Sequence, residues 1–340
     1  MFEKTIYHDL NSHIQDVYYI PQRNCKRDEK MARAKADRNK TIDTPLSEGL
    51  PFLERCITIT EKQRDLKFVT DKIIIGDMLA VSPLLPEKSV DLIVADPPYN
   101  LTKSFNGTTF AKRSCSAYES YTRQWLAAVK PLLKETGSIY VCCDWESSLI
   151  IGRVLGEFFH VRNRITWQRE KGRGAKVNWK NAMEDIWFAT NSNDYTFNLE
   201  AVKIRKKVIA PYRVEGKPKD WDETAEGKFR DTCPSNFWDD ITIPFWSMPE
   251  NTAHPTQKPE KLLAKIILAS SSAGDLILDP FSGSGTTCVA AKKLDRRYMG
   301  IEIEKQYCVW AEQRLEMAES APEIQGYADG VFWERNSFTK

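Results

Sequence analysis

The 340-residue chain lacks the features that mark several large classes of protein. Its eight cysteines form no Cys-x-x-Cys pair and it has only four histidines, so a zinc site is not expected. No apolar run approaches the roughly 20 residues that cross a bilayer, and none follows the N-terminal Met1-Phe2-Glu3-Lys4, which argues against a secretory signal. We therefore expect free thiols in a reducing compartment, with no bound metal and no membrane contact.

Charge of one sign is not in excess either. The net charge is +2, and a composition of 41% hydrophobic and 28% charged residues is ordinary for a soluble globular protein. The charge is uneven, however, because residues 161–219 contain 14 Lys and Arg against 6 Asp and Glu. Such a block favours a polyanion such as nucleic acid as a partner, although a solvated basic face would have the same composition.

Strand-like and helix-like segments alternate along most of the chain. Short apolar runs predict strands, and apolar residues at helical spacing predict helices. The predicted strands are residues 72–75, 90–95, 138–143, 165–167, 185–189, 275–278 and 297–303, and the predicted helices are residues 118–133, 147–158, 259–270, 286–294 and 305–317. Gly137 is expected to end the helix over 118–133. The alternation predicts an α/β fold with a doubly wound, mostly parallel sheet.

A glycine-containing segment follows the predicted strand over 275–278. It runs Asp279-Pro280-Phe281-Ser282-Gly283-Ser284-Gly285-Thr286 and opens directly into a predicted helix, where glycines allow a ligand to approach the backbone and free N–H groups face it. Glu302 ends the next strand, 17 positions after Gly285, where a carboxylate can accept hydrogen bonds from ribose hydroxyls. This order of elements predicts a nucleoside-binding site.

The same segment argues against a dinucleotide. The third glycine of a Gly-x-Gly-x-x-Gly pattern would fall at Cys288, and Asp279 would place negative charge where a diphosphate lies. A nicotinamide-dependent dehydrogenase is therefore disfavoured. Asp279 suits a cationic ligand instead, and S-adenosylmethionine carries a sulfonium and an ammonium but no phosphate.

A second segment, Asp96-Pro97-Pro98-Tyr99-Asn100, follows the predicted strand over 90–95. The exocyclic amine of adenine or cytosine is a poor nucleophile until its lone pair localises on nitrogen, and two acceptors aimed at its hydrogens favour that state. Asp96 supplies a carboxylate, Pro97 a backbone carbonyl in a rigid turn, and Tyr99 a face for base stacking. A base inside a duplex must be flipped out to reach such a pocket. A merely rigid turn is the structural alternative.

With these two segments in this order, the chain resembles the bacterial DNA amino-methyltransferases, the adenine-N6/cytosine-N4 family, and within it the permuted group in which the Asp-Pro-Pro-Tyr motif precedes the S-adenosylmethionine motif. The family's Gly-Asp pair is matched by Gly76-Asp77, and its His-Pro-Thr-Gln-Lys-Pro segment by His254 to Pro259. Asn236-Phe237-Trp238-Asp239 also resembles a segment that often precedes the histidine. The resemblance covers residues 72–315.

The resemblance implies an enzyme that transfers a methyl group directly from S-adenosylmethionine to the N6 amine of a flipped adenine in double-stranded DNA, without a metal. It assigns catalysis to Asp96, Pro97, Pro98 and Tyr99. It assigns cofactor binding to Asp77, near the adenine; to Thr256, Gln257 and Lys258, near the carboxylate; and to Asp279, Phe281, Ser282, Gly283, Ser284, Gly285, Thr286 and Glu302. A role in restriction-modification and a homodimer are both open.

The predicted organisation has five parts. Residues 1–70 are an N-terminal extension without a clear pattern; residues 71–190 are the catalytic half and residues 251–318 the S-adenosylmethionine half of one domain; residues 191–250, where the periodic pattern fails, are a target-recognition region; and residues 319–340 are a C-terminal tail. The loop over 101–115, with Lys103, Asn106, Lys112 and Arg113, is expected to cover the flipped base or touch DNA. We expect a cytoplasmic, nucleoid-associated protein of a bacterial or phage-infected cell.

Three alternatives remain at this stage. A cytosine-N4 enzyme is disfavoured because such family members more often carry Ser where this chain has Asp96. An RNA- or protein-directed amino-methyltransferase is disfavoured because those families often carry Asn there and have the unpermuted order. A DNA-binding module without turnover is disfavoured because Asp96, Tyr99, Gly283 and Gly285 are all present.

Overall fold

The structure is a computed structural model that describes residues 36–101, 103–105, 108–110, 112–169, 177–209, 213–215, 217–224 and 227–335. Contacts divide the chain into two units, residues 1–37 and residues 38–340, and the second contains every element discussed below. The predicted Asn106 contact and the tip of the C-terminal tail fall outside the described residues.

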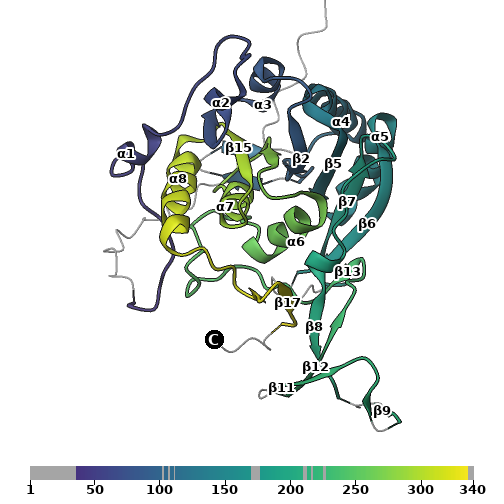
Figure 1. The fold of residues 1–340 in the computed structure, drawn as a ribbon. Coiled ribbons are helices and arrows are strands. Elements are labelled where there is room, and N and C mark those ends of the chain that lie inside the picture. The colour runs from purple at the N-terminus through teal and green to yellow at the C-terminus, as the bar shows by residue number, and fades with distance from the viewer. Residues whose placement is uncertain are drawn as a thin grey trace, which may run out of the picture. The chain divides into compact units, whose positions relative to one another are not determined.

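An eight-stranded sheet forms the centre of the second unit (Figure 1). In spatial order its strands are β1 (Lys72–Ile75), β15 (Arg297–Glu302), β14 (Leu276–Asp279), β2 (Val90–Ala95), β5 (Leu133–Cys143), β7 (Met183–Thr190), β6 (His160–Gln168) and β13 (Phe237–Trp238). The first five are mutually parallel, β7 is antiparallel to both of its neighbours, and β13 is parallel to β6. The predicted mostly parallel α/β fold is confirmed.

Helices cover both faces of this sheet (Figure 1). One face packs against α3 (Met78–Val81), α4 (Cys115–Val129) and α5 (Trp145–Phe158), and the other against α6 (Glu260–Ser270), α7 (Thr286–Lys293) and α8 (Lys305–Ser320). Each face contributes its own buried cluster, because alternate strand residues point to opposite sides. The short helices α1 (Leu50–Leu53) and α2 (Leu66–Val69) precede the sheet, and single 3₁₀ turns span Ser82–Leu84, Lys130–Leu132 and Glu200–Val202.

One boundary prediction was wrong. The helix expected over 118–133 and ended by Gly137 runs instead over Cys115–Val129, and Gly137 lies inside β5. Pro131 accounts for the earlier end, because proline has no N–H to donate and the turn tightens to 3₁₀ geometry at Lys130–Leu132. At the other end of α4 the Ser114 side chain accepts from the Ala117 amide, which explains the start.

The inserted region builds a second sheet together with the C-terminal segment. Its order is β11 (Asp222–Thr224), β12 (Gly227–Thr232), β8 (Ile204–Lys207), β17 (Val331–Trp333) and β16 (Tyr327–Ala328). A two-stranded hairpin, β9 (Arg213–Val214) with β10 (Lys217–Pro218), lies beyond it (Figure 1). The segment expected as a tail from residue 319 thus begins inside α8 and supplies two strands to the sheet of the inserted region.

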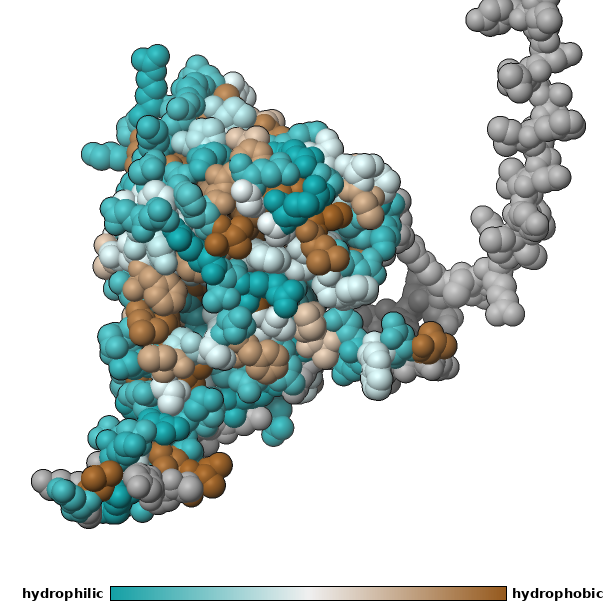
Figure 2. Space-filling view, turned by 90° about the vertical axis from the view of Figure 1, so that its right-hand side faces the viewer, coloured by the Kyte–Doolittle hydropathy of each residue, from teal (hydrophilic) through white to brown (hydrophobic). Residues whose placement is uncertain are grey.

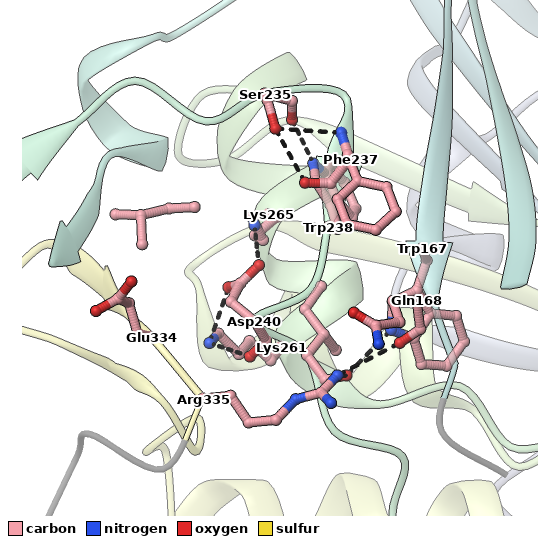
Figure 3. A network of polar contacts seen from close by, with 12 residues as sticks. Trp167, Gln168, Ser235, Phe237, Trp238, Asp240, Lys261, Lys265, Glu334 and Arg335 are labelled. Carbon is pink, nitrogen blue, oxygen red and sulfur yellow. Dashed lines mark hydrogen bonds and ion pairs between the residues drawn. The ribbon is translucent and has the colours of Figure 1, made fainter. Parts of the chain in front are cut away.

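A buried polar network joins the two sheets (Figure 3). Asp240 accepts from Lys265 at 2.8 Å and pairs with Lys261 at 2.9 Å, and Lys261 also donates to the Trp333 carbonyl at 2.5 Å. Arg335 donates to the Ile241 carbonyl at 2.8 Å. Helix α6, which supplies both lysines, is therefore fixed to the segment before it in sequence and to β17.

The face of the molecule shown in Figure 2 is mainly hydrophilic. On the face seen in Figure 2, from the side of α5 and β6, apolar side chains occur in separate patches. Within the described ranges, no helix is both long and apolar enough to cross a membrane.

Candidate active site

The two predicted motifs meet at one edge of the large sheet. Parallel strands β2, β14 and β15 end there with Ala95, Asp279 and Glu302. Asp96 to Tyr99, Phe281 to Ser284 and Glu302 line a single cavity, which extends over about 1070 Å³ when its open mouth is included. A concave site lined by apolar side chains with a few converging polar groups is typical of small-molecule binding. The arrangement on which the sequence-based prediction depends is therefore present.

The Asp96 turn is held from two helices. The Tyr118 hydroxyl of α4 donates to the Pro98 carbonyl at 3.2 Å, and the Asn100 amide lies 3.3 Å from the Ser147 hydroxyl of α5. The Asn100 side chain also exchanges hydrogen bonds with the Arg113 backbone, at 2.7 and 3.0 Å, and so fixes the end of the loop that follows the motif. These contacts keep the turn rigid at the cavity wall.

The loop after the motif contains a short hairpin, β3 (Lys103–Phe105) with β4 (Thr108–Phe110). Of its predicted basic contacts, Lys112 forms an ion pair with Glu146, and the Arg113 guanidinium lies 4.9 Å from the centre of the Tyr121 ring. Both groups therefore have protein partners, and whether the loop touches a base or DNA stays a prediction.

The Asp96 carboxylate is bound by two donors. The Tyr99 hydroxyl donates to Oδ1 at 2.9 Å, and the Lys258 ammonium donates to Oδ2 at 2.6 Å and lies 3.1 Å from the Tyr99 hydroxyl. Glu184, at the start of β7, approaches both donors, since its Oε2 is 3.3 Å from the Tyr99 hydroxyl and 3.4 Å from the Lys258 ammonium. Its other oxygen is paired with Arg169.

These buried groups shift one another's proton affinities. Burial by itself would lower the pKa of Lys258, but the carboxylates of Asp96 and Glu184 raise it above its usual value. Burial, and then the same two carboxylates, raise the pKa of Tyr99 well above its usual range. Lys258 is thus held as a cation and Tyr99 as a neutral hydroxyl that can donate.

The opposite wall of the cavity is formed by the glycine-containing loop. Gly283 and Gly285 both have positive φ, +53° and +77°, which favours glycine. A Cβ on Gly285 would lie 2.6 Å from the Ala311 Cβ of α8, so this position also allows α7 and α8 to pack closely. The Trp125 ring meets Phe281 edge-on at 5.6 Å and fixes its orientation.

Two buried carboxylates face this loop, and burial raises the pKa of each. Glu302 accepts from the amides of Gly283, at 2.7 Å, and Glu304, at 2.8 Å, while burial raises its pKa. Asp279 accepts from the Thr287 hydroxyl at 2.5 Å and from the Phe281 amide at 3.0 Å, but burial outweighs these contacts and raises its pKa to about 7. A cationic ligand group beside Asp279 would restore its charge.

Asp77 lies on the other side of Phe281. It caps α3 by accepting from the Leu79 amide at 2.8 Å, and it lines an adjoining pocket together with Phe281, Glu302 and Tyr121. Because Phe281 and Glu302 border both pockets, a nucleoside bound at Glu302 can extend toward Asp77. Whether Asp77 contacts an adenine stays a prediction.

The segment from His254 to Pro259 crosses the cavity between the two walls. Thr256, Gln257 and Lys258 all line it. The Gln257 side chain is used to hold the segment itself, because it accepts from Thr252 at 2.7 and 2.8 Å and donates to the Glu250 carbonyl at 2.7 Å. Burial lowers the pKa of His254 to about 4, so this ring is neutral where it faces Gly283 and Tyr307.

The sequence did not reveal two parts of this arrangement. Glu184 and Arg169 were not singled out, and Lys258 was expected near a cofactor carboxylate, whereas its ammonium contacts Asp96 in the structure. An acidic residue at the start of an apolar strand is a weak signal for Glu184. Within the described ranges, no group of three His, Cys, Asp or Glu side chains is placed to hold a metal ion.

Known proteins share this sequence pattern and fold. Residues 90–313 match the family model described as DNA methylase. The chain is 35% identical to DNA adenine methyltransferase YhdJ of Escherichia coli (strain K12) over 72% of this chain and 83% of that protein. It is also 35% identical to the type II methyltransferase M.HpaI of Haemophilus parainfluenzae, over 68% of this chain and 70% of that protein. The solved PvuII DNA methyltransferase (cytosine-N4-specific) has the same fold, with a TM-score of 0.50 and 18% identity over 74% of this chain and 92% of that one.

Proposed function

Because the chain belongs to the family of N6/N4 DNA amino-methyltransferases, we propose that it transfers a methyl group from S-adenosylmethionine to the N6 amine of adenine in double-stranded DNA. The observation that carries the proposal is that the Asp96 turn and the loop from Phe281 to Ser284 are opposite walls of one cavity. A methyl donor held by one wall then faces an amine held by the other.

Two observations support adenine over cytosine. The motif begins with Asp96, the residue type expected for adenine-N6 members, and the relative YhdJ, 35% identical, is named a DNA adenine methyltransferase. The cytosine-N4 enzyme with the same fold is only 18% identical, so it bears on the fold and not on the base. Cytosine-N4 methylation is the alternative that the test below separates.

The cofactor-binding residues fit S-adenosylmethionine. Glu302 would accept hydrogen bonds from the ribose, Asp77 would lie near the adenine, and Asp279 beside a positive group. Ser282, Gly283, Ser284, Gly285 and Thr286 form the turn and helix start around it, and Thr256 and Gln257 border the same cavity. When bound, the cofactor supplies an electrophilic methyl group on its sulfonium.

The residues of this chain position the target amine. The Tyr99 ring gives the flipped base a face for stacking, Asp96 and the Pro97 carbonyl accept from the amine hydrogens, and Pro98 keeps the turn rigid. Placing the amine in line with the donated methyl lowers the entropic part of the barrier. The positive charge that develops on the amine nitrogen is stabilised by the Asp96 carboxylate. No covalent bond to the protein is required.

The duplex would contact the region over 191–250. Phosphate contacts from Lys and Arg anchor a protein without recognising sequence. In the structure several basic residues of this region have acidic partners nearby, including Arg205, whose guanidinium makes two 2.8 Å hydrogen bonds to Asp231, and Lys203, which pairs with Glu200 at 2.6 Å. Arg213 and Lys228 lie on the Trp221 ring, at 5.1 and 5.2 Å from its centre. These pairs keep the Lys and Arg side chains ordered on the sheet of the inserted region and on the β9–β10 hairpin.

Mass analysis of nucleosides tests the proposal. Genomic DNA from a strain without the protein is incubated with it and labelled S-adenosylmethionine, and N6-methyladenine is the expected product. Asp96→Ala should remove the product and retain binding to the duplex. N4-methylcytosine as the only product would overturn the choice of adenine, and undiminished methylation by Asp96→Ala would overturn the mechanism.

A further inference from the structure

Glu184 is a buried carboxylate in the active site to which the reaction outlined above gives no role. It is 3% exposed and is the second residue of β7, the strand that is antiparallel to its neighbours and so brings its N-terminal residues to the catalytic edge. With Asp96, Lys258 and Arg169 it forms a cluster of two acids and two bases. The cluster is balanced in charge, so its members can exchange partners without leaving an unpaired charge.

Two close contacts in this cluster occupy both oxygens of Asp96. Lys258 holds one of its oxygens at 2.6 Å and Tyr99 the other at 2.9 Å. An Asp96 carboxylate whose charge is already paired in this way attracts a developing ammonium-like amine less strongly than a free carboxylate does. At least one donor must therefore move before the target amine can make its full interaction with Asp96.

Glu184 offers both donors a second acceptor. Its Oε2 atom is 3.4 Å from the Lys258 ammonium and 3.3 Å from the Tyr99 hydroxyl, so a displacement of less than an ångström changes their partner. Arg169 is bound at Oε1 and keeps the carboxylate oriented. Charge on Glu184 is what makes this second position favourable for an ammonium.

We propose that Glu184 is a positioning residue that accepts Lys258 and Tyr99 when the target amine arrives, so that the Asp96 carboxylate becomes free to bind the amine. This inference rests on the proposed methyl transfer to an amino group and holds for adenine or cytosine. No bond forms or breaks in the exchange, and no proton is transferred.

Substitution in two backgrounds tests the exchange. Glu184→Gln keeps the shape but removes the charge, so Lys258 stays on Asp96, the competent state becomes rare, and kcat should fall by about tenfold or more. In the Lys258→Gln background only the uncharged Tyr99 hydroxyl has to leave Asp96, and its move depends little on the charge of residue 184, so the same Glu184→Gln change should alter kcat by less than about twofold. Labelled methyl transfer to total genomic DNA gives kcat whichever base accepts the methyl.

Controls separate positioning from folding. The adjacent Asp185 is equally buried but points to the other face of the sheet, where it accepts from Ser148 at 2.7 Å and Thr166 at 2.9 Å. Asp185→Asn should reduce thermal stability and leave kcat near that of the unsubstituted protein. Calorimetric binding of S-adenosylhomocysteine to Glu184→Gln should be unchanged, which shows that the cofactor wall is intact.

The proposal is wrong if Glu184→Gln lowers kcat equally in both backgrounds. It is also wrong if Glu184→Gln weakens S-adenosylhomocysteine binding while kcat is retained. A lack of methyl transfer by the unsubstituted protein would instead refute the proposed function.

Discussion

Acidification should weaken S-adenosylmethionine binding because Asp279 must be ionised to face a cationic ligand. Asp279 is 5% exposed, and burial raises the pKa of its carboxyl to about 7 in spite of hydrogen bonds from Thr287 and Phe281. Asp96 and Glu302 add negative charge nearby and raise it further. Without a cation beside it, Asp279 is therefore partly neutral and partly charged near neutral pH.

The magnitude follows from proton linkage. With a pKa of about 7, roughly nine tenths of Asp279 is ionised at pH 8 and roughly one tenth at pH 6. If the cation binds only the ionised form, the dissociation constant rises about tenfold from pH 8 to pH 6, which corresponds to about 1.4 kcal/mol. Because the raised pKa disfavours the anionic form of Asp279, the affinity for the cofactor is full above pH 7 and falls as the pH drops below 7.

Isothermal titration calorimetry measures this directly. At pH 7, titrations in two buffers of different ionisation enthalpy should show release of about half a proton per cofactor bound. Asp279→Asn should bind more weakly at pH 8 and lose this proton release. Glu250, whose pKa burial also raises to about 7, lies outside the cavity and is intact in both proteins, so the comparison isolates Asp279. Affinity that is constant or rises on acidification would refute the reasoning.

Three further outcomes are expected. Asp240→Asn should lower the free energy of unfolding by about 3 kcal/mol in urea titrations, because it leaves the two buried lysines of α6 without their charged partner. The matched change at the exposed neighbour, Asp239→Asn, should alter the free energy of unfolding by less than about 0.5 kcal/mol. Gly285→Ala should weaken cofactor binding by about tenfold or more in calorimetry, because the new Cβ would lie 2.6 Å from Ala311. Gly274 has a positive φ as well but open space around it, so Gly274→Ala should cost only about 1–2 kcal/mol of stability and leave cofactor binding unchanged. Removing divalent metals with a chelator should not alter the methylation rate measured with labelled cofactor, and a loss restored by added metal would contradict the metal-free mechanism.

Local sequence was sufficient for the elements and for most of the cavity wall. The apolar run over Val90–Ala95 forms β2 with the predicted bounds, and the segments after β2, β14 and β15 meet because carboxyl ends of parallel strands share an edge. Patterns of this kind depend on neighbouring residues alone. The wrong prediction for the C-terminal end of α4 also has a local cause, because Pro131 and not Gly137 decides where this helix ends.

Contacts across the chain were decided only by the tertiary structure. Lys258 meets Asp96 across 162 positions, and Glu184 reaches them because β7 runs antiparallel, a direction that an apolar strand pattern does not specify. The C-terminal strands β16 and β17 join the sheet of the inserted region. This pairing also depends on the whole fold, because a strand pairs with an edge that is free once the chain has folded. The sequence by itself thus determined most of the groups that line the cavity, whereas the fold added Glu184 and Arg169 and decided that Asp96 and Glu184 share the donors Lys258 and Tyr99.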